Sequence, residues 1–93
     1  MVKIFVSQRE IELLMMCYKT MKIPTNYIIS EQSIIIPNNE KDNLYIMFNC
    51  ILDVFLIIGV SDNGEPNDVG MELETLNTKI NHEYVIFNSK RHN

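Results

Sequence analysis

The feature that most constrains the fold is a 17-residue apolar run, Leu44 to Val60, in which Asn49 and Asp53 are the clearly polar residues. As a transmembrane helix the run has the minimum length, since about 17 to 25 residues are needed, and a central carboxylate costs about 2.5 to 3.5 kcal/mol. As a helix in water it would place Asn49 and Asp53 one turn apart, with apolar side chains nearly everywhere else. Both arrangements compete with a pair of strands.

Composition favours the strand pair. Nine of the 17 residues are β-branched or aromatic, the types that are enriched in strands. Periodicity cannot separate helix from strand in a continuous apolar run, so composition and length decide. We therefore expect strands near residues 43–48 and 54–60, with a turn between them.

The N-terminal residues predict a strand followed by a helix. Apolar side chains alternate along residues 2–6, which is the period-2 pattern of a strand. Ser7 stands three residues before Glu10, the spacing of a capping box, in which hydroxyl and carboxylate satisfy each other's free backbone amides. A helix therefore begins after Ser7, and it ends at Ile23 because Pro24 follows.

The apolar face of this helix is broader than a surface helix needs. Its main stripe keeps the i, i+3, i+4, i+7 spacing and consists of Ile11, Leu14, Met15 and Tyr18. Leu13 and Met16 lie off that stripe, so the helix must be deeply packed or must present a second face to a partner. Leu13 and Met16 are therefore our candidate residues for self-association.

Two short β-branched runs at residues 27–29 and 34–36 predict a hairpin, because the polar residues 30–33 between them are long enough for a turn. Residues 37–42 are polar and predict an exposed loop. Residues 61–66, Ser-Asp-Asn-Gly-Glu-Pro, form the strongest turn signal in the chain.

A second helix is predicted beyond that turn, over residues 69–80. The apolar residues Val69, Leu73, Leu76 and Ile80 follow 4, 3, 4 spacing. Asn67 or Asp68 can cap the helix. A strand is the rival interpretation, because apolar and other residues also alternate over 69–74. Residues 84–87 predict a final strand, and residues 89–93 a frayed basic tail.

These elements give the order β-α-β-β-β-β-α-β in one domain that spans residues 1–93. Short polar turns join most neighbouring strands, so we expect an α+β fold with a mostly antiparallel sheet and two helices packed on one face.

No motif for catalysis or cofactor binding is present. The glycine spacings match no phosphate-binding loop, and His82 and His92 form no close ligand pair with each other or with a cysteine. We expect no metal, no cofactor, no catalytic residue and no enzyme activity. A site with Cys17 or Cys50 near His82, assembled only by the fold, is the alternative that a structure can test.

Cellular location is inferred from the two cysteines, which lie in apolar runs where a free thiol behaves as a small hydrophobe. The sequence also shows no signal-peptide pattern and no Asn-x-Ser/Thr site. We therefore expect a cytoplasmic protein. Abundant Asn and Ile, with no Ala or Trp, indicate an AT-rich gene. Such genes are typical of low-GC bacteria, their phages and mobile elements, and of some eukaryotic viruses and parasites.

Charge is distributed unevenly along the chain. Residues 42–78 contain seven acidic residues and neither Lys nor Arg, while the whole chain has a net charge of −4. Such a region repels nucleic-acid phosphates and attracts a basic surface. The candidate partner-binding residues are Asp62, Glu65, Asp68, Glu72 and Glu74.

The sequence thus predicts a small acidic module that binds a basic protein surface, as an inhibitor, immunity protein or antitoxin does. We expect neither nucleic acid nor a membrane as its partner. The alternative is a self-associating accessory subunit that forms a homodimer. An acidic face that serves only solubility would explain the same charges.

Overall fold

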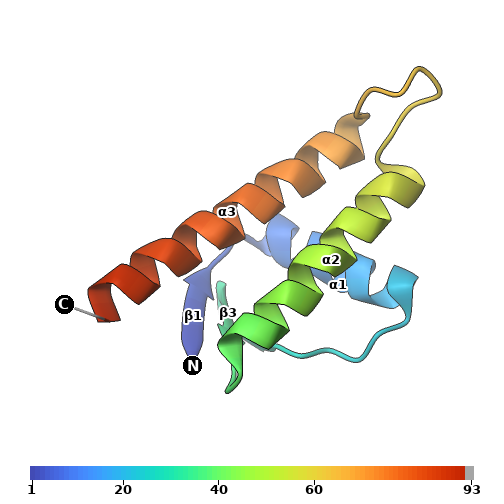
Figure 1. Cartoon of the computed structure of the whole chain (residues 1–93). Helices are drawn as coiled ribbons and strands as arrows, with labels where there is room; N and C mark the ends of the chain where they lie inside the picture. The colour runs from blue at the N-terminus through green and yellow to red at the C-terminus, as the bar shows by residue number, and fades with distance from the viewer. Residues whose placement is uncertain (92–93) are drawn as a thin grey trace.

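A computed structural model describes residues 1–91 of the chain as three strands and three helices. Their order is β1 (Val2–Phe5), α1 (Gln8–Met21), β2 (Ile28–Ser30), β3 (Ser33–Ile36), α2 (Glu40–Ile58) and α3 (Asp68–Arg91) (Figure 1). The expected α+β class with an antiparallel sheet is confirmed, but the element order differs from the prediction after β3.

The sheet has the strand order β1-β3-β2, and both pairings are antiparallel. One face carries the fully buried side chains of Val2, Ile4, Ile34 and Ile36, while Phe5 on the other face is exposed. α3 packs against β1, α2 packs against β3, and α1 packs against α2. The helices therefore bury one face of the sheet and leave the other open.

The predicted N-terminal elements are confirmed. Ser7 N donates to Glu10 Oε1 at 2.7 Å and Glu10 N donates to Ser7 Oγ at 3.1 Å, so the capping box begins α1 as expected. α1 ends at Lys22, which takes a left-handed conformation shortly before Pro24. The expected hairpin is formed by β2 and β3, and Glu31 in its turn has a positive φ of 55°.

The two strands predicted at residues 43–48 and 54–60 are wrong, because one helix, α2, occupies this region. Its buried side chains include Leu44, Met47, Ile51 and Val54, whose 3, 4, 3 spacing lines a single helical face. Packing along that face overrides the β propensity of the composition. The predicted loop at 37–42 is also shorter than expected, since α2 begins at Glu40.

The helix predicted at residues 69–80 is confirmed and is longer than expected. Gly70 N donates to Asn67 Oδ1 at 2.8 Å, so Asn67 caps α3. The final strand predicted at residues 84–87 is wrong, because Tyr84 and Phe87 extend the apolar spacing of α3 and pack against the core. Residues 89–91 of the predicted tail are helical, and residues 92 and 93 lie outside the described residues.

Two glycines allow the end of α2 to touch the start of α3. A Cβ atom on Gly70 would lie 2.0 Å from the carbonyl oxygen of Gly59, and one on Gly59 would lie 2.9 Å from Cα of Gly70. A side chain at either position would force the two backbones apart. α2 and α3 therefore form a close antiparallel hairpin, with the loop of residues 59–67 at its end (Figure 1).

Among the described residues, no helix has the length and apolar character that crossing a membrane requires.

Candidate protein-binding surfaces

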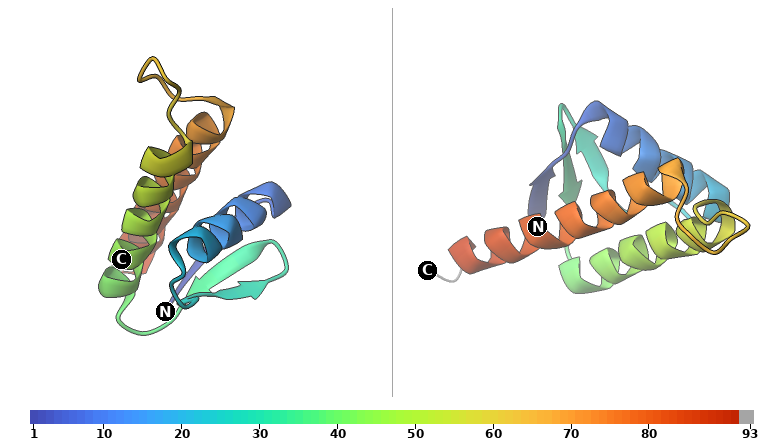
Figure 2. Two further views of the ribbon diagram at one scale, coloured as in Figure 1. Left: turned by 90° about the vertical axis from the view of Figure 1, so that its right-hand side faces the viewer. Right: turned by 90° about the horizontal axis from the view of Figure 1, so that it is seen from above.

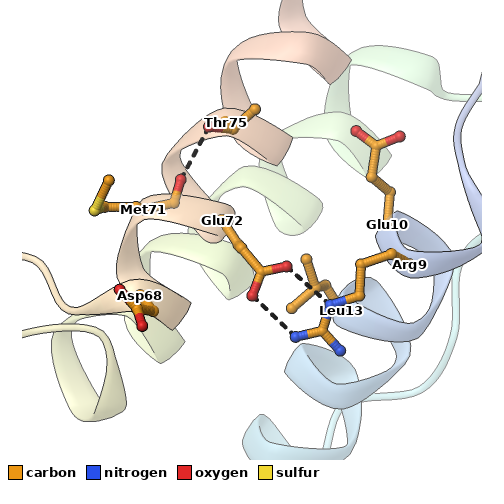
Figure 3. A pocket seen from close by; sticks show the side chains of 7 residues that line it. All are labelled: Arg9, Glu10, Leu13, Asp68, Met71, Glu72 and Thr75. Carbon is orange, nitrogen blue, oxygen red and sulfur yellow. Dashed lines mark hydrogen bonds and ion pairs between the residues drawn. The ribbon is translucent and has the colours of Figure 1, made fainter.

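Two ion pairs connect α1 to α3. Arg9 donates to Glu72 through Nε at 2.8 Å and through a terminal nitrogen at 2.9 Å, a bidentate pair that Figure 3 shows. Lys79 Nζ donates to Glu10 Oε1 at 2.7 Å. The charges of Arg9 on α1 and Lys79 on α3 are therefore both paired within the chain.

The pKa values of the two carboxyl groups reflect these contacts. The hydrogen bond from Arg9, together with its charge, lowers the pKa of Glu72. Burial raises the pKa of Glu10, but hydrogen bonds from Lys79 and Ser7 outweigh burial and hold the pKa below its usual value. Both carboxylates are thus stabilised in their ionised form.

An open groove of about 390 Å³ lies between α1 and the start of α3. Its lining residues, all labelled in Figure 3, are Arg9, Glu10, Leu13, Asp68, Met71, Glu72 and Thr75. The Arg9–Glu72 pair crosses the groove, so its charges are already compensated. The groove brings together Asp68 and Glu72 of the predicted acidic residues.

Three predicted acidic residues gather at the end of the α2–α3 hairpin, which we call the acidic tip: Asp62, Glu65 and Asp68. All three are exposed. Among the described side chains, no Lys or Arg pairs with any of them. The tip therefore presents uncompensated negative charge to solvent.

The backbone of the tip is ordered by its own hydrogen bonds. Ser61 N donates to the Glu65 carbonyl at 2.7 Å, and Gly64 N donates to the Ser61 carbonyl at 2.9 Å. Gly64 has a φ of +85°, a conformation that glycine adopts without strain. The tip is a defined turn and not an unstructured linker.

The other predicted site residues lie elsewhere. Glu74 is exposed on α3 and lines a small cavity with residues of α2, away from the groove. Leu13 is 3% exposed and belongs to the core, and Met16 is half-buried against it. The breadth of the apolar face of α1 is thus explained by deep packing at Leu13.

Sequence reasoning missed an exposed apolar surface on α2, opposite the buried face of that helix. Tyr45 is 70% exposed, Leu56 is 64% exposed and Leu52 is 49% exposed. We call this surface the outer stripe; it consists of Tyr45, Ile46, Asn49, Leu52, Leu56 and Ile57. Seen from above in Figure 2, α2 lies along one edge of the molecule, with the other elements on its inner side.

The sequence held a signal for this stripe. Tyr45, Asn49, Leu52 and Leu56 follow 4, 3, 4 spacing, which is the spacing of a helix seam. The strand prediction for this run conceals that spacing. In the helical alternative, Asn49 and Asp53 were expected to lie one turn apart, and α2 places them so.

A small cavity of about 100 Å³ lies between side chains of α2 and α3, beside the outer stripe. It is lined in part by Leu52, Phe55 and Asn77. The Oδ1 atom of Asn77 is buried and accepts no hydrogen bond from the described residues. An unsatisfied buried acceptor of this kind costs about 1 to 3 kcal/mol.

The cysteines and His82 do not meet in a shared site. Cys17 and Cys50 are buried in the core, where burial raises the pKa of Cys17 to about 12 and that of Cys50 to about 11. His82 is exposed on α3 beside Thr78 and Lys79, in a groove that contains no cysteine. Within residues 1–91 no group of three or more His, Cys, Asp or Glu side chains is arranged to hold a metal ion.

No protein-family model, no curated protein and no solved structure matches this chain.

Proposed function

We propose that this chain is a stoichiometric protein-binding module whose acidic tip docks on a basic surface of another protein. The observation that carries the proposal is the exposure of Asp62, Glu65 and Asp68 together, with no paired cation among the described side chains. Glu72, by contrast, is paired with Arg9 through two hydrogen bonds. The charge of the tip is thus not compensated by the described side chains and can attract a partner.

Apolar side chains next to the tip support docking over simple solubility. Ile57 and Ile58, at the end of α2, are exposed immediately before the turn that carries the acidic residues. An apolar centre with a polar rim is the usual anatomy of a protein interface. The partner surface that fits is one with basic residues around an apolar patch.

The charge would act mainly on the rate of association. Electrostatic steering raises association rate constants and selects partners more than it deepens affinity. It also disfavours nucleic acid, because the tip repels phosphates. An inhibitor, immunity or antitoxin-like role is consistent with such a module.

The test is affinity capture from a cell lysate with the immobilised chain and a variant of the tip, Asp62→Asn with Glu65→Gln. A true partner is captured by the native chain, is lost with the tip variant, and is reduced when salt is raised from about 0.05 M to about 0.5 M, where charges are screened within a few ångströms.

The matched control is Glu12→Gln with Glu31→Gln, which removes the same charge from exposed positions on α1 and the β2–β3 turn. This variant should retain the partner. Equal capture by both variants, or the absence of any salt-sensitive partner, would refute the acidic tip as the docking surface.

A further inference from the structure

We infer that the outer stripe of α2 binds a second copy of this chain, with the two α2 helices antiparallel across a two-fold axis. This inference goes beyond the proposed function and does not depend on it, because it makes no use of an outside partner, although the outer stripe shares Ile57 with the surface beside the acidic tip.

The first argument is the apolar character of the stripe. Five large apolar side chains of one helix are exposed there by 44% to 70%: Tyr45, Ile46, Leu52, Leu56 and Ile57. A helix that is apolar on all sides is normally buried on all sides. The single charge on this face between Tyr45 and Ile57 is Asp53, which is exposed and lies within the stripe, between Asn49 and Ile57 around the helix. α2 therefore exposes to solvent a surface that is nearly as apolar as a protein core.

The second argument is area. If a fully exposed large apolar side chain presents roughly 150 to 200 Å², the stripe exposes about 500 Å², near the upper end for a monomer. A stable interface buries about 800 Å² on each partner. The stripe supplies more than half of that area, and the ends of the hairpin lie where they can supply the remainder.

The third argument is symmetry. A two-fold interface must be complementary to itself, because the same patch faces its own copy. A stripe with apolar residues at seam spacing and without an internal charge pair meets this requirement.

Charge at the two ends of the hairpin selects the antiparallel orientation. The acidic tip lies at one end; the opposite end carries exposed Lys41 at the start of α2 and exposed Lys90 near the end of α3. Glu40 and Asp42 flank Lys41, but Glu40 pairs with the N-terminal amine at 2.6 Å, so the two lysines outweigh the charge of Asp42. An antiparallel pair places each tip beside the basic end of the other copy, whereas a parallel pair would bring both acidic tips together.

The register follows from the stripe itself. From Tyr45 to Leu56 the helix rises about 16 Å. A two-fold axis between Asn49 and Leu52 sets Tyr45 opposite Leu56 and Asn49 opposite Leu52 of the second copy. Both hairpins then form a four-helix layer with a sheet on each outer side.

The first test is sedimentation velocity on the full chain at tens of micromolar. The native chain should sediment as a dimer, and Leu56→Glu should weaken dimerisation at least about 30-fold, because it would place a charge among the apolar side chains of the interface. The matched control is Met15→Glu on α1, where Met15 is 51% exposed but lies away from the stripe. It should remain dimeric. Circular dichroism verifies that both variants fold.

The second test determines orientation by disulfide cross-linking. Neither Tyr45→Cys nor Leu56→Cys should cross-link alone, whereas a mixture of the two variants should, since the native cysteines are buried. A monomeric native chain, or an equal effect of Leu56→Glu and Met15→Glu, would overturn the inference. Cross-linking of either variant with itself would overturn the antiparallel arrangement.

Discussion

α2 and α3 belong to the same hairpin and pack on the same face of the sheet, yet their outer surfaces differ. The outward positions of α3 are largely polar and include Glu74, Thr75, Thr78, Asn81 and His82. The outward positions of α2 form the outer stripe, which is largely apolar. Both helices are built alike toward the core, so the core does not explain the difference.

The contrast separates what folding requires from what it does not. α3 shows that a helix in this fold needs only its inner seam to be apolar, with residues such as Leu73, Leu76 and Ile80 fully buried. The outer stripe of α2 is therefore surplus to the stability of the single chain. A surface of that kind is best explained by contact with another molecule.

The largest expected effect tests whether the inner seams are equivalent. Ile51→Ala in α2 and Leu76→Ala in α3 should each lower the free energy of unfolding by about 3 kcal/mol, because both side chains are almost fully buried. Ile57→Ala, on the outer stripe, should lower it by less than about 0.5 kcal/mol in dilute solution. Urea denaturation measures all three. A large loss at Ile57 in dilute solution would show that the stripe serves folding.

The next effect tests the junction of the two helices. Gly70→Ala should lower the free energy of unfolding by about 2 kcal/mol, because the new Cβ would overlap the Gly59 carbonyl oxygen, 2.0 Å away. Gly64→Ala is the control: no heavy atom lies within 4 Å, and only its φ of +85° opposes a side chain. It should cost about 1 kcal/mol. A harmless Gly70→Ala would mean that the hairpin is looser than described.

The elements that were predicted correctly are those marked by local chemistry. Ser7 and Glu10 mark the start of α1, and Asn67 marks the start of α3. These signals can be read from sequence because a capping side chain bonds to a backbone group within four residues. α2 has no such mark. Its N-cap, Asn39, makes no side-chain capping hydrogen bond, and its continuous apolar run hides the period. Only packing against α1, α3 and the sheet determines that it is a helix.

The candidate surfaces were only partly accessible from sequence. The acidic tip could be predicted, because charge is visible residue by residue and a turn exposes it. The pairing of Glu72 with Arg9 could not, since the two residues are 63 positions apart. The outer stripe depends on the helical state of α2, so the error in secondary structure concealed it.

A smaller effect concerns the contact between the two helices. Asn77→Leu should raise the free energy of unfolding by about 1 kcal/mol, because it replaces a buried acceptor that has no donor among the described residues. Urea denaturation at a fixed dilute concentration measures this change. Asn81→Leu, at an exposed position one turn along α3, is the control and should change stability little. A destabilised Asn77→Leu would show that the amide has a partner.

The smallest expected effect is the pH dependence of the ion pair between Glu10 and Lys79, which connects α1 to α3. α2 has no corresponding ion pair to α1 among the described side chains. Because the pKa of Glu10 is lowered by its contacts in the folded chain, its contribution is present above the unfolded pKa, near 4.5, and is lost as pH falls through the folded pKa. Stability should therefore fall as the pH is lowered through about 4.5 and below. Lys79→Met should be less stable at neutral pH and should lose less on acidification. Asp53→Asn on α2, where the native carboxylate makes no ion pair with the described side chains, should leave this pH profile unchanged.

The most direct test of the outer stripe is the chemical accessibility of Tyr45. Tyr45 is 70% exposed in the single chain, whereas Tyr18 and Tyr27 are buried. Iodination followed by peptide mass spectrometry should modify Tyr45 first in dilute solution, and raising the protein concentration should protect it while Met15 stays equally open to oxidation. Tyr45 that reacts equally at every concentration would contradict the account, because the apolar face of α2 would then remain in water.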